Sequence, residues 1–372
     1  MLYETVVQMV QFSAEIASPY PFFLIFNQMV LKLCNSCLGN AGAGHGGRGG
    51  NGYSGSVPGQ TYGSLYQPLS HGSGSTSGSG GGVVRLEARD TVTMDGVVSV
   101  NGENGMSSLT GGASGGSVWI SSKLFKGNGV VRASGGSGLF GTSGGGGGGR
   151  ISVDFDNRTF SGKIEAYGGP GTKEAGGAGT IYLHNKVHDY KQLIVDNNNV
   201  GSPLTDDITE ERFDGGRTWL APEPNTTAMT FDEVDIRGHS QLAVLTSPPG
   251  SRIRWDVRGI LGDRSGILHV RPNQELKMIS NGRQQQPELL WGVNIYPRAD
   301  LKLSQNLFVD GIKMIVAGSL SGAQNVTVGN KGKLILRYVQ VGFRVNPPAK
   351  DYSILFCNIH RWINIYLMYL NF

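Results

Sequence analysis

The chain has 372 residues, 59 of them glycine and three of them cysteine, and its formal net charge is +4. No run of Lys or Arg reaches four residues, so nothing predicts nucleic-acid binding or a strongly anionic-membrane-binding surface. Cys34, Cys37 and Cys357 lie near the two ends, which excludes a disulfide framework in the body. The single Cys-x-x-Cys pair has no accompanying histidines, so we expect neither a zinc site nor any other cofactor.

Residues 1–38 contain no glycine and have an apolar, aromatic centre at 22–26. The segment lacks the basic start of a signal peptide. Polar residues (Asn27, Gln28, Lys32) interrupt the apolar run that a spanning helix would need. Residues 344–372 form a second glycine-free, apolar tail with similar interruptions. We expect both ends to be atypical segments outside the main fold, and the sequence leaves membrane attachment open.

Residues 39–199 form a glycine-rich array with a regular repeat. The hexapeptide beginning at Gly81 (Gly-Gly-Val-Val-Arg-Leu) returns in related form at Gly115 and Gly148, and a looser copy begins at Gly179. Val84, Val118 and Ile151 therefore lie 34 and 33 residues apart. A second element, at Val98, Val131 and Ile164, recurs every 33 residues. Two elements that recur with one period indicate stacked structural repeats.

Each repeated element reads as a β-strand, because apolar and polar residues alternate over four to six positions bounded by glycine. Glycine in a helix costs about 1 kcal/mol relative to alanine, so helices between the strands are not expected. A parallel β-helix, or β-solenoid, with glycine-rich corners satisfies both constraints. Because one coil cannot bury its own apolar row, we expect Val84, Val118 and Ile151 to form an inward ladder. Low-complexity disorder is the alternative, but a disordered tract needs no fixed apolar period.

Residues 200–230 interrupt the repeat. Five carboxylates fall within 206–214, without the spacing of an EF-hand, so an acidic linker or loop insertion is favoured over a calcium site, although calcium binding is left open.

Residues 231–343 form a second array with less glycine. Two apolar-x-apolar triplets eight residues apart recur four times, with first members Val234, Leu268, Val293 and Val326. Turn-forming residues such as Gly238-His239-Ser240 and Pro272-Asn273 separate the triplets. We interpret these as four equivalent strand–corner–strand units of a continuing solenoid.

Catalysis or binding on a solenoid surface requires side chains that point outward from the strands. These are predicted to be Arg85, Glu87, Trp119, Arg132, Ser152, Asp154, Glu165, Tyr182 and His184. Asp154 and Glu165 follow on successive strands and are the best pair for a hydrolytic carboxylate dyad. A solvated surface pair is the more common meaning of such a spacing, so we assign no catalytic residue.

Three Asn-x-Ser/Thr sequons, at Asn157, Asn225 and Asn325, predict N-glycosylation if the chain is secreted. The last of them overlaps a predicted strand, which makes its use less favourable.

Several motifs together resemble a known group of proteins: Tyr62-Gly63-Ser64-Leu65-Tyr66, the run Gly144 to Arg150, and the segment 262–270. Over roughly residues 39–342 the chain is similar to the glycine-rich solenoid regions of very large extracellular proteins of invertebrates and plants. The resemblance implies a piece of a longer secreted or cell-surface protein that acts in a matrix or in adhesion. We therefore expect a non-catalytic module that contacts glycans or other extracellular proteins. A carbohydrate-active β-helix enzyme, a polysaccharide lyase or a glycoside hydrolase, is the alternative.

Overall fold

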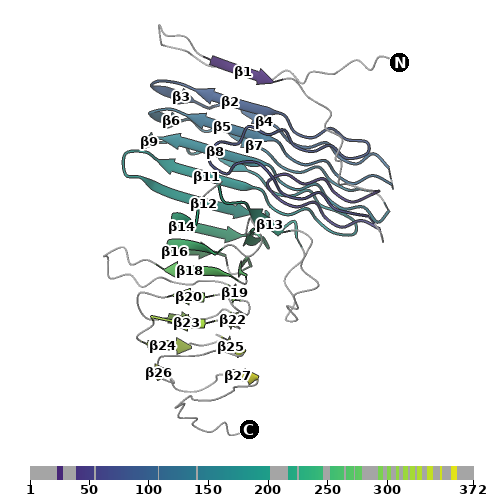
Figure 1. The fold of residues 1–372 in the computed structure, drawn as a ribbon. Helices are drawn as coiled ribbons and strands as arrows, with labels where there is room; N and C mark the ends of the chain where they lie inside the picture. Colours follow the sequence, from purple (N-terminus) through teal and green to yellow (C-terminus); the bar gives the residue numbers. More distant parts are fainter. Residues whose placement is uncertain are drawn as a thin grey trace. The chain divides into compact units, whose positions relative to one another are not determined.

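The fold consists of β-strands and extended segments. The computed structural model describes residues 39–53, 56–107, 109–139, 141–201, 217–223, 226–245, 252–263, 265–271 and 273–278, together with separate strands outside these ranges (Figure 1). These residues contain no α-helix, and most neighbouring strands are parallel and in register. The prediction of an all-β parallel solenoid is confirmed.

The chain forms two compact units, residues 1–189 and 190–372. Composition alone placed the end of the glycine-rich array at residue 199.

The strands of the first unit lie in three sheets, and their pairs are parallel except for that of β1 with β2. The first holds β2 (Val83–Glu87), β5 (Ser117–Ser121), β8 (Arg150–Phe155) and β11 (Thr180–Asn185), with β1 (Phe23–Asn27) antiparallel to β2. The second holds β3 (Thr91–Thr93), β6 (Leu124–Lys126) and β9 (Asn157–Arg158). The third holds β4 (Val97–Ser99), β7 (Val130–Arg132) and β10 (Lys163–Glu165). Each full repeat therefore carries three strands, where the sequence predicted two.

The inward apolar ladder forms as predicted. Val84 is paired with Val118, and Val118 with Ile151, which is in turn paired with Ile181 of β11. All four side chains are buried. Burying a side chain of this size contributes about 1.5–3 kcal/mol, and no single coil could provide that burial alone.

The glycine-rich segments between the strands form extended rods that pack into a separate layer. We call this the glycine layer. It comprises residues 40–52, 100–105, 111–116, 133–138, 144–149, 166–171 and 174–179. The backbone N–H groups of the rod 144–149 point to a different neighbour at each successive residue. Gly144 and Gly147 donate to Asn40 and Ala43, Gly145 and Gly148 to Glu174 and Gly177, and Gly146 and Gly149 to Gly136 and Ala133. A three-residue period without internal hydrogen bonds is the geometry of polyproline II.

Close packing of these rods explains the six consecutive glycines at 144–149. A Cβ atom built at any one of them would lie 1.8–2.0 Å from a backbone carbonyl oxygen of another segment. No side chain fits at that separation, so the rod excludes every residue except glycine. Rods at the rim have neighbours on fewer sides and accept residues such as Asn101 and Asn104, which are exposed.

The strands of the second unit lie in two longer sheets and one short one. The first holds β12 (Tyr190–Asp196), β14 (Ala228–Arg237), β16 (Ile253–Gly262), β18 (Gln274–Met278), β20 (Asp300–Lys302) and β23 (Ser319–Ser321). The second holds β13 (Arg217–Leu220), β15 (Gln241–Val244), β17 (Ile267–Val270), β19 (Gly292–Ile295), β22 (Lys313–Val316), β25 (Lys333–Arg337) and β27 (Ser353–Cys357). A short third sheet holds β21 (Leu307–Val309), β24 (Asn325–Val328) and β26 (Arg344–Val345). Strand β13 and the start of β14 fall inside the range expected to be a linker.

The four strand–corner–strand copies of this unit are real strands, but they are not equivalent. Val234 pairs with Ile260 of β16, a strand outside the predicted pattern, and not with Leu268. Leu268 instead pairs with Leu242, so the second copy begins on the sheet where the first copy ends. The interpretation of equivalent units was therefore wrong. The true ladder (Leu242, Leu268, Val293, Met314, Leu334, Ile354) has steps of 26, 25, 21, 20 and 20 residues.

Candidate functional site

Alternation along β2, β5, β8 and β11 places three rows of polar and aromatic side chains on the outward face of their sheet. Parallel pairing aligns the rows across the strands. The rows are Ser117, Arg150 and Thr180; Arg85, Trp119, Ser152 and Tyr182; and Glu87, Ser121, Asp154 and His184.

Residues 60–73, which we call the strap, cover the first two rows. Three outward side chains donate hydrogen bonds to strap carbonyl oxygens: Ser117 to Ser70 at 2.6 Å, Arg150 to Tyr62 at 2.8 Å, and Ser152 to Tyr66 at 2.7 Å. The Tyr66 ring meets the Tyr182 ring edge to face, with centroids 4.9 Å apart. The strap therefore lies across the side of the solenoid.

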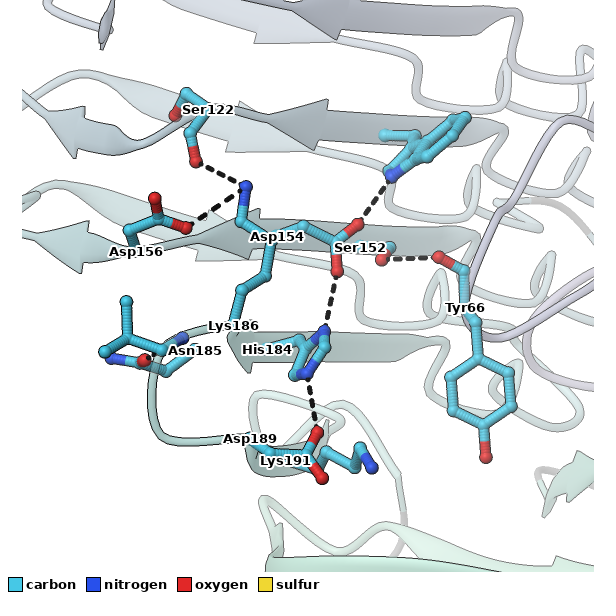
Figure 2. A network of polar contacts seen from close by, with 12 residues as sticks. Tyr66, Ser122, Ser152, Asp154, Asp156, His184, Asn185, Lys186, Asp189 and Lys191 are labelled. Atoms are coloured by element: carbon cyan, nitrogen blue, oxygen red, sulfur yellow. Dashed lines mark hydrogen bonds and ion pairs between the residues drawn. The ribbon is translucent and has the colours of Figure 1, made fainter. Parts of the chain in front are cut away.

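The third row carries a chain of polar contacts beside the strap (Figure 2). Trp119 Nε1 donates to Asp154 Oδ2 at 2.9 Å, and Asp154 Oδ1 lies 3.1 Å from His184 Nδ1. On its other side, His184 Nε2 lies 3.1 Å from Asp189 Oδ1. One imidazole therefore joins a strand carboxylate to a turn carboxylate.

A second contact fixes the same turn to the sheet. Lys186 Nζ donates to the backbone oxygen of Ser122 at 3.0 Å and lies 3.3 Å from Asp156 Oδ1 (Figure 2). Asn185 Oδ1 accepts from the backbone N–H groups of Val187 and His188 and closes the turn. His184 and Asp189 thus extend from a short, well-bonded connection.

The arrangement limits the chemistry of His184. Both ring nitrogens face carboxylates, so neither is directed at a hydroxyl nucleophile. Ser152, the nearest outward serine of the neighbouring row, donates to the strap. General acid–base work by the imidazole would require Asp189 to move away.

The structure does not join Asp154 and Glu165, the predicted carboxylate pair. Glu165 lies on β10 in another sheet, where its carboxylate accepts from Arg132 Nε at 2.8 Å. The two side chains bind different partners, so the idea of a dyad at these positions was wrong. The error arose because the sequence did not reveal strand β9, which lies in the chain between β8, with Asp154, and β10, with Glu165.

Two other histidines are fully buried. Burial, and secondarily the charge of Arg150, lowers the pKa of His45 to about 3, although a hydrogen bond to the Gly115 backbone opposes the shift. His45 Nδ1 donates to that carbonyl oxygen at 2.7 Å, while Nε2 is buried without a hydrogen-bond partner. Burial likewise lowers the pKa of His269, assisted by Arg217 and Arg271. Both imidazoles are therefore neutral core groups.

Only some of the predicted glycosylation and candidate metal sites lie among the described residues. Asn157 lies on β9, and Asn157 and Thr159 of its sequon are exposed. Asn225, the 206–214 carboxylates, Cys34 and Cys37 lie outside the described residues. Asn325 begins β24, of which the backbone alone is described. Within the part of the chain with described side chains, no three His, Cys, Asp or Glu residues converge as metal ligands.

Sequence reasoning missed the strap and the pairing of Asp154 with His184. The second could have been found, because aligning Gly-Thr-Ile-Tyr-Leu at 179–183 with the preceding repeat sets His184 directly opposite Asp154. The strap left no such signal, since residues 60–73 have no apolar period.

The described residues include no helix long and apolar enough to cross a membrane. Comparisons of this chain with protein-family models, curated proteins and solved structures find no match.

Proposed function

We propose that this chain is a structural and interaction module of an extracellular matrix or cell-surface protein, a non-catalytic scaffold that contacts glycans or other proteins. One observation carries the proposal: outward-facing charged side chains pair with one another between neighbouring coils. In the first unit, Lys123 pairs with Asp90, Arg132 with Glu165 and His184 with Asp154, each pair joining neighbouring coils. Charges arranged in this way hold coils together instead of converging on a substrate.

The backbone supports the same role. Rods of the glycine layer bond to rods of other coils, so the layer has little freedom to open. A rigid surface of this kind favours binding, because little conformational entropy is lost when a partner docks. The exposed sequon at Asn157 fits a secreted chain.

The alternative is a carbohydrate-active β-helix enzyme. Asp154, His184 and Asp189 favour it, since they place two carboxylates around an imidazole on an outward face. In that reading, His184 would be the acid–base group and Asp154 would orient it.

The test uses the whole chain, secreted from eukaryotic cells. We expect treatment with an N-glycosidase to increase its electrophoretic mobility, and Asn157→Gln to remove one step of that shift. If the secreted Asn157→Gln variant has the same electrophoretic mobility as the parent before N-glycosidase treatment, Asn157 carries no glycan. That result would contradict the extracellular assignment.

A second arm addresses catalysis. The same protein is incubated with acidic and neutral polysaccharides, and new reducing ends and unsaturated sugars are measured. We expect no products above the level given by His184→Ala. Product formation that His184→Ala and Asp154→Asn abolish, while Asp156→Asn retains it, would replace the scaffold with the enzyme.

A further inference from the structure

Loops connect the rods of the glycine layer at its outer end, which is remote from strands β2, β5 and β8 (Figure 1). We call three of these loops, residues 53–57, 106–110 and 139–143, the tips. The described residues expose ten large apolar side chains, and five of these lie on the tips: Tyr53, Val57, Met106, Leu109 and Leu139. Exposed apolar side chains are therefore concentrated at one end of the layer.

Hydrogen bonds place the tips beside one another. Asn40 Oδ1 accepts from the backbone N–H of Tyr53 at 2.8 Å, and Asn40 Nδ2 donates to the backbone oxygen of Thr142 at 3.0 Å. One buried side chain thus joins the first tip to the third. The rods that enter the second and third tips are also joined, since the Gly105 N–H donates to the Ser137 oxygen at 2.8 Å. The five apolar side chains therefore belong to one surface of the first unit.

Hydrogen bonds within the tips hold these side chains outward. The backbone N–H and the Oγ of Ser56 donate to the Tyr53 oxygen at 3.0 and 2.7 Å. The Thr110 N–H donates to the Ser107 oxygen at 3.1 Å, and the Ser107 N–H donates to Thr110 Oγ1 at 3.0 Å. Leu109, inside that second turn, is 74% exposed. Apolar groups that are grouped on a surface and kept in water mark an interaction site.

The charges at this end of the layer indicate what the tips contact. The three tips contain no charged residue. The nearby carboxylates of Glu103 and Glu174 accept backbone N–H groups at 2.8 and 2.9 Å. Lys173 is exposed and lies beside the third tip, where its N–H donates to the Ser143 oxygen at 3.0 Å. Apolar groups bordered by a cation complement a phospholipid interface, in which acyl chains lie beneath phosphate groups.

We propose that the tips bind the surface of a phospholipid bilayer, and that Tyr53, Met106, Leu109 and Leu139 enter the interface between headgroups and acyl chains. A second copy of the chain fits less well, because a stable protein interface buries about 800 Å² of each partner through about 20–30 residues. A bilayer requires no complementary shape, and tyrosine is enriched at its interface. The inference goes beyond the proposed function, since a matrix scaffold needs no lipid contact.

The experiment is flotation of the full chain with vesicles of phosphatidylcholine at an ionic strength of about 0.15 M. We expect the parent to float with the vesicles. Replacing Met106, Leu109 and Leu139 together by serine should weaken binding at least about tenfold, because the apolar area that leaves water is lost. Val187→Ser is the matched control. Val187 is 64% exposed but lies in the turn after β11, so this variant should bind as the parent does.

Two further measurements identify the kind of contact. Binding should not weaken when the ionic strength is raised to about 1 M, since salt screens charges and leaves apolar burial in place. Circular dichroism and the urea midpoint of the triple variant should match those of the parent, because the replaced side chains are exposed. Leu109→Ser, at the most exposed of the three positions, provides a second comparison with a smaller loss of binding.

The proposal is overturned if the parent does not float, or if the triple variant and Leu109→Ser float as well as the parent. It is also overturned if binding needs phosphatidylserine and disappears at high salt. Sedimentation that finds a dimer of the parent and a monomer of the triple variant would assign the tips to a second copy instead. A failure of the proposed function is distinguishable, since Asn157→Gln leaves the tips intact and should float unchanged.

Discussion

His45 illustrates how one residue can tie stability to pH. Its ring is completely buried, and its pKa is lowered to about 3, first by burial and then by Arg150. Since the unfolded chain binds the proton near the ordinary histidine pKa of about 6.5, it holds more protons than the folded chain between the two values. The contribution is complete above about pH 6.5 and is lost progressively as the pH falls toward 3.

We expect the free energy of unfolding to fall on acidification by up to about 1.4 kcal/mol per pH unit through this residue. His45→Asn places an amide N–H close to the position of Nδ1, which donates to the Gly115 carbonyl oxygen, but it cannot titrate. Urea unfolding at a series of pH values should show a smaller slope for the variant than for the parent below about pH 6.5. Because the pKa of buried His269 is also lowered, a residual slope of the same sign is expected in the variant. Equal slopes would show that His45 is not held neutral.

At the scale of the element, the rod 144–149 packs closely because its residues have no side chains. A Cβ at Gly147 would lie 2.0 Å from the carbonyl oxygen of Gly47, whereas one at Gly82 meets nothing within 4 Å. We expect Gly147→Ala to destabilise the protein by about 1–3 kcal/mol or more through overpacking. Gly82→Ala, the matched control, should stay within about 0.5 kcal/mol of the parent.

Chemical denaturation of the two variants measures this difference. The comparison removes the general effect of replacing glycine by alanine in the unfolded chain, since both variants share it. Equal stability of Gly147→Ala and Gly82→Ala would mean that the rods do not pack as closely as described.

At the scale of the whole molecule, the glycine layer and the sheets of the first unit belong to one hydrogen-bonded structure. Every N–H group from Gly144 to Gly149 donates to a backbone oxygen of another segment. We therefore expect these amides to exchange with solvent about as slowly as those of strand β8, although the rod belongs to no sheet. Gly141, at an exposed tip, should exchange rapidly. Hydrogen exchange followed by mass spectrometry tests this, and fast exchange throughout 144–149 would favour a disordered glycine tract.

The sequence by itself determined the class of fold and the inward ladder of the first unit. Alternation is local, and steps of 34 and 33 residues keep Val118 over Val84 and Ile151 over Val118, so both could be read without coordinates. The pairing of Asp154 with His184 was likewise accessible, because it follows from the same alignment. The turn residues between the second set of strands were also readable: His239 and Asn273 adopt the left-handed conformation that such corners use.

Tertiary structure alone decided three things. Glycine has no side chain, so no pattern along the chain shows that the rods pack against one another, and their hydrogen bonds join residues far apart in sequence. Coil length varies in the second unit, so no constant step aligns its strands. A strand–corner–strand pattern looks the same whether it begins on one sheet or on the other. For these two reasons Val234 and Leu268 were wrongly equated. The strap and the turn that carries Asp189 are placed by contacts with side chains of distant coils, and such contacts leave no period in the sequence.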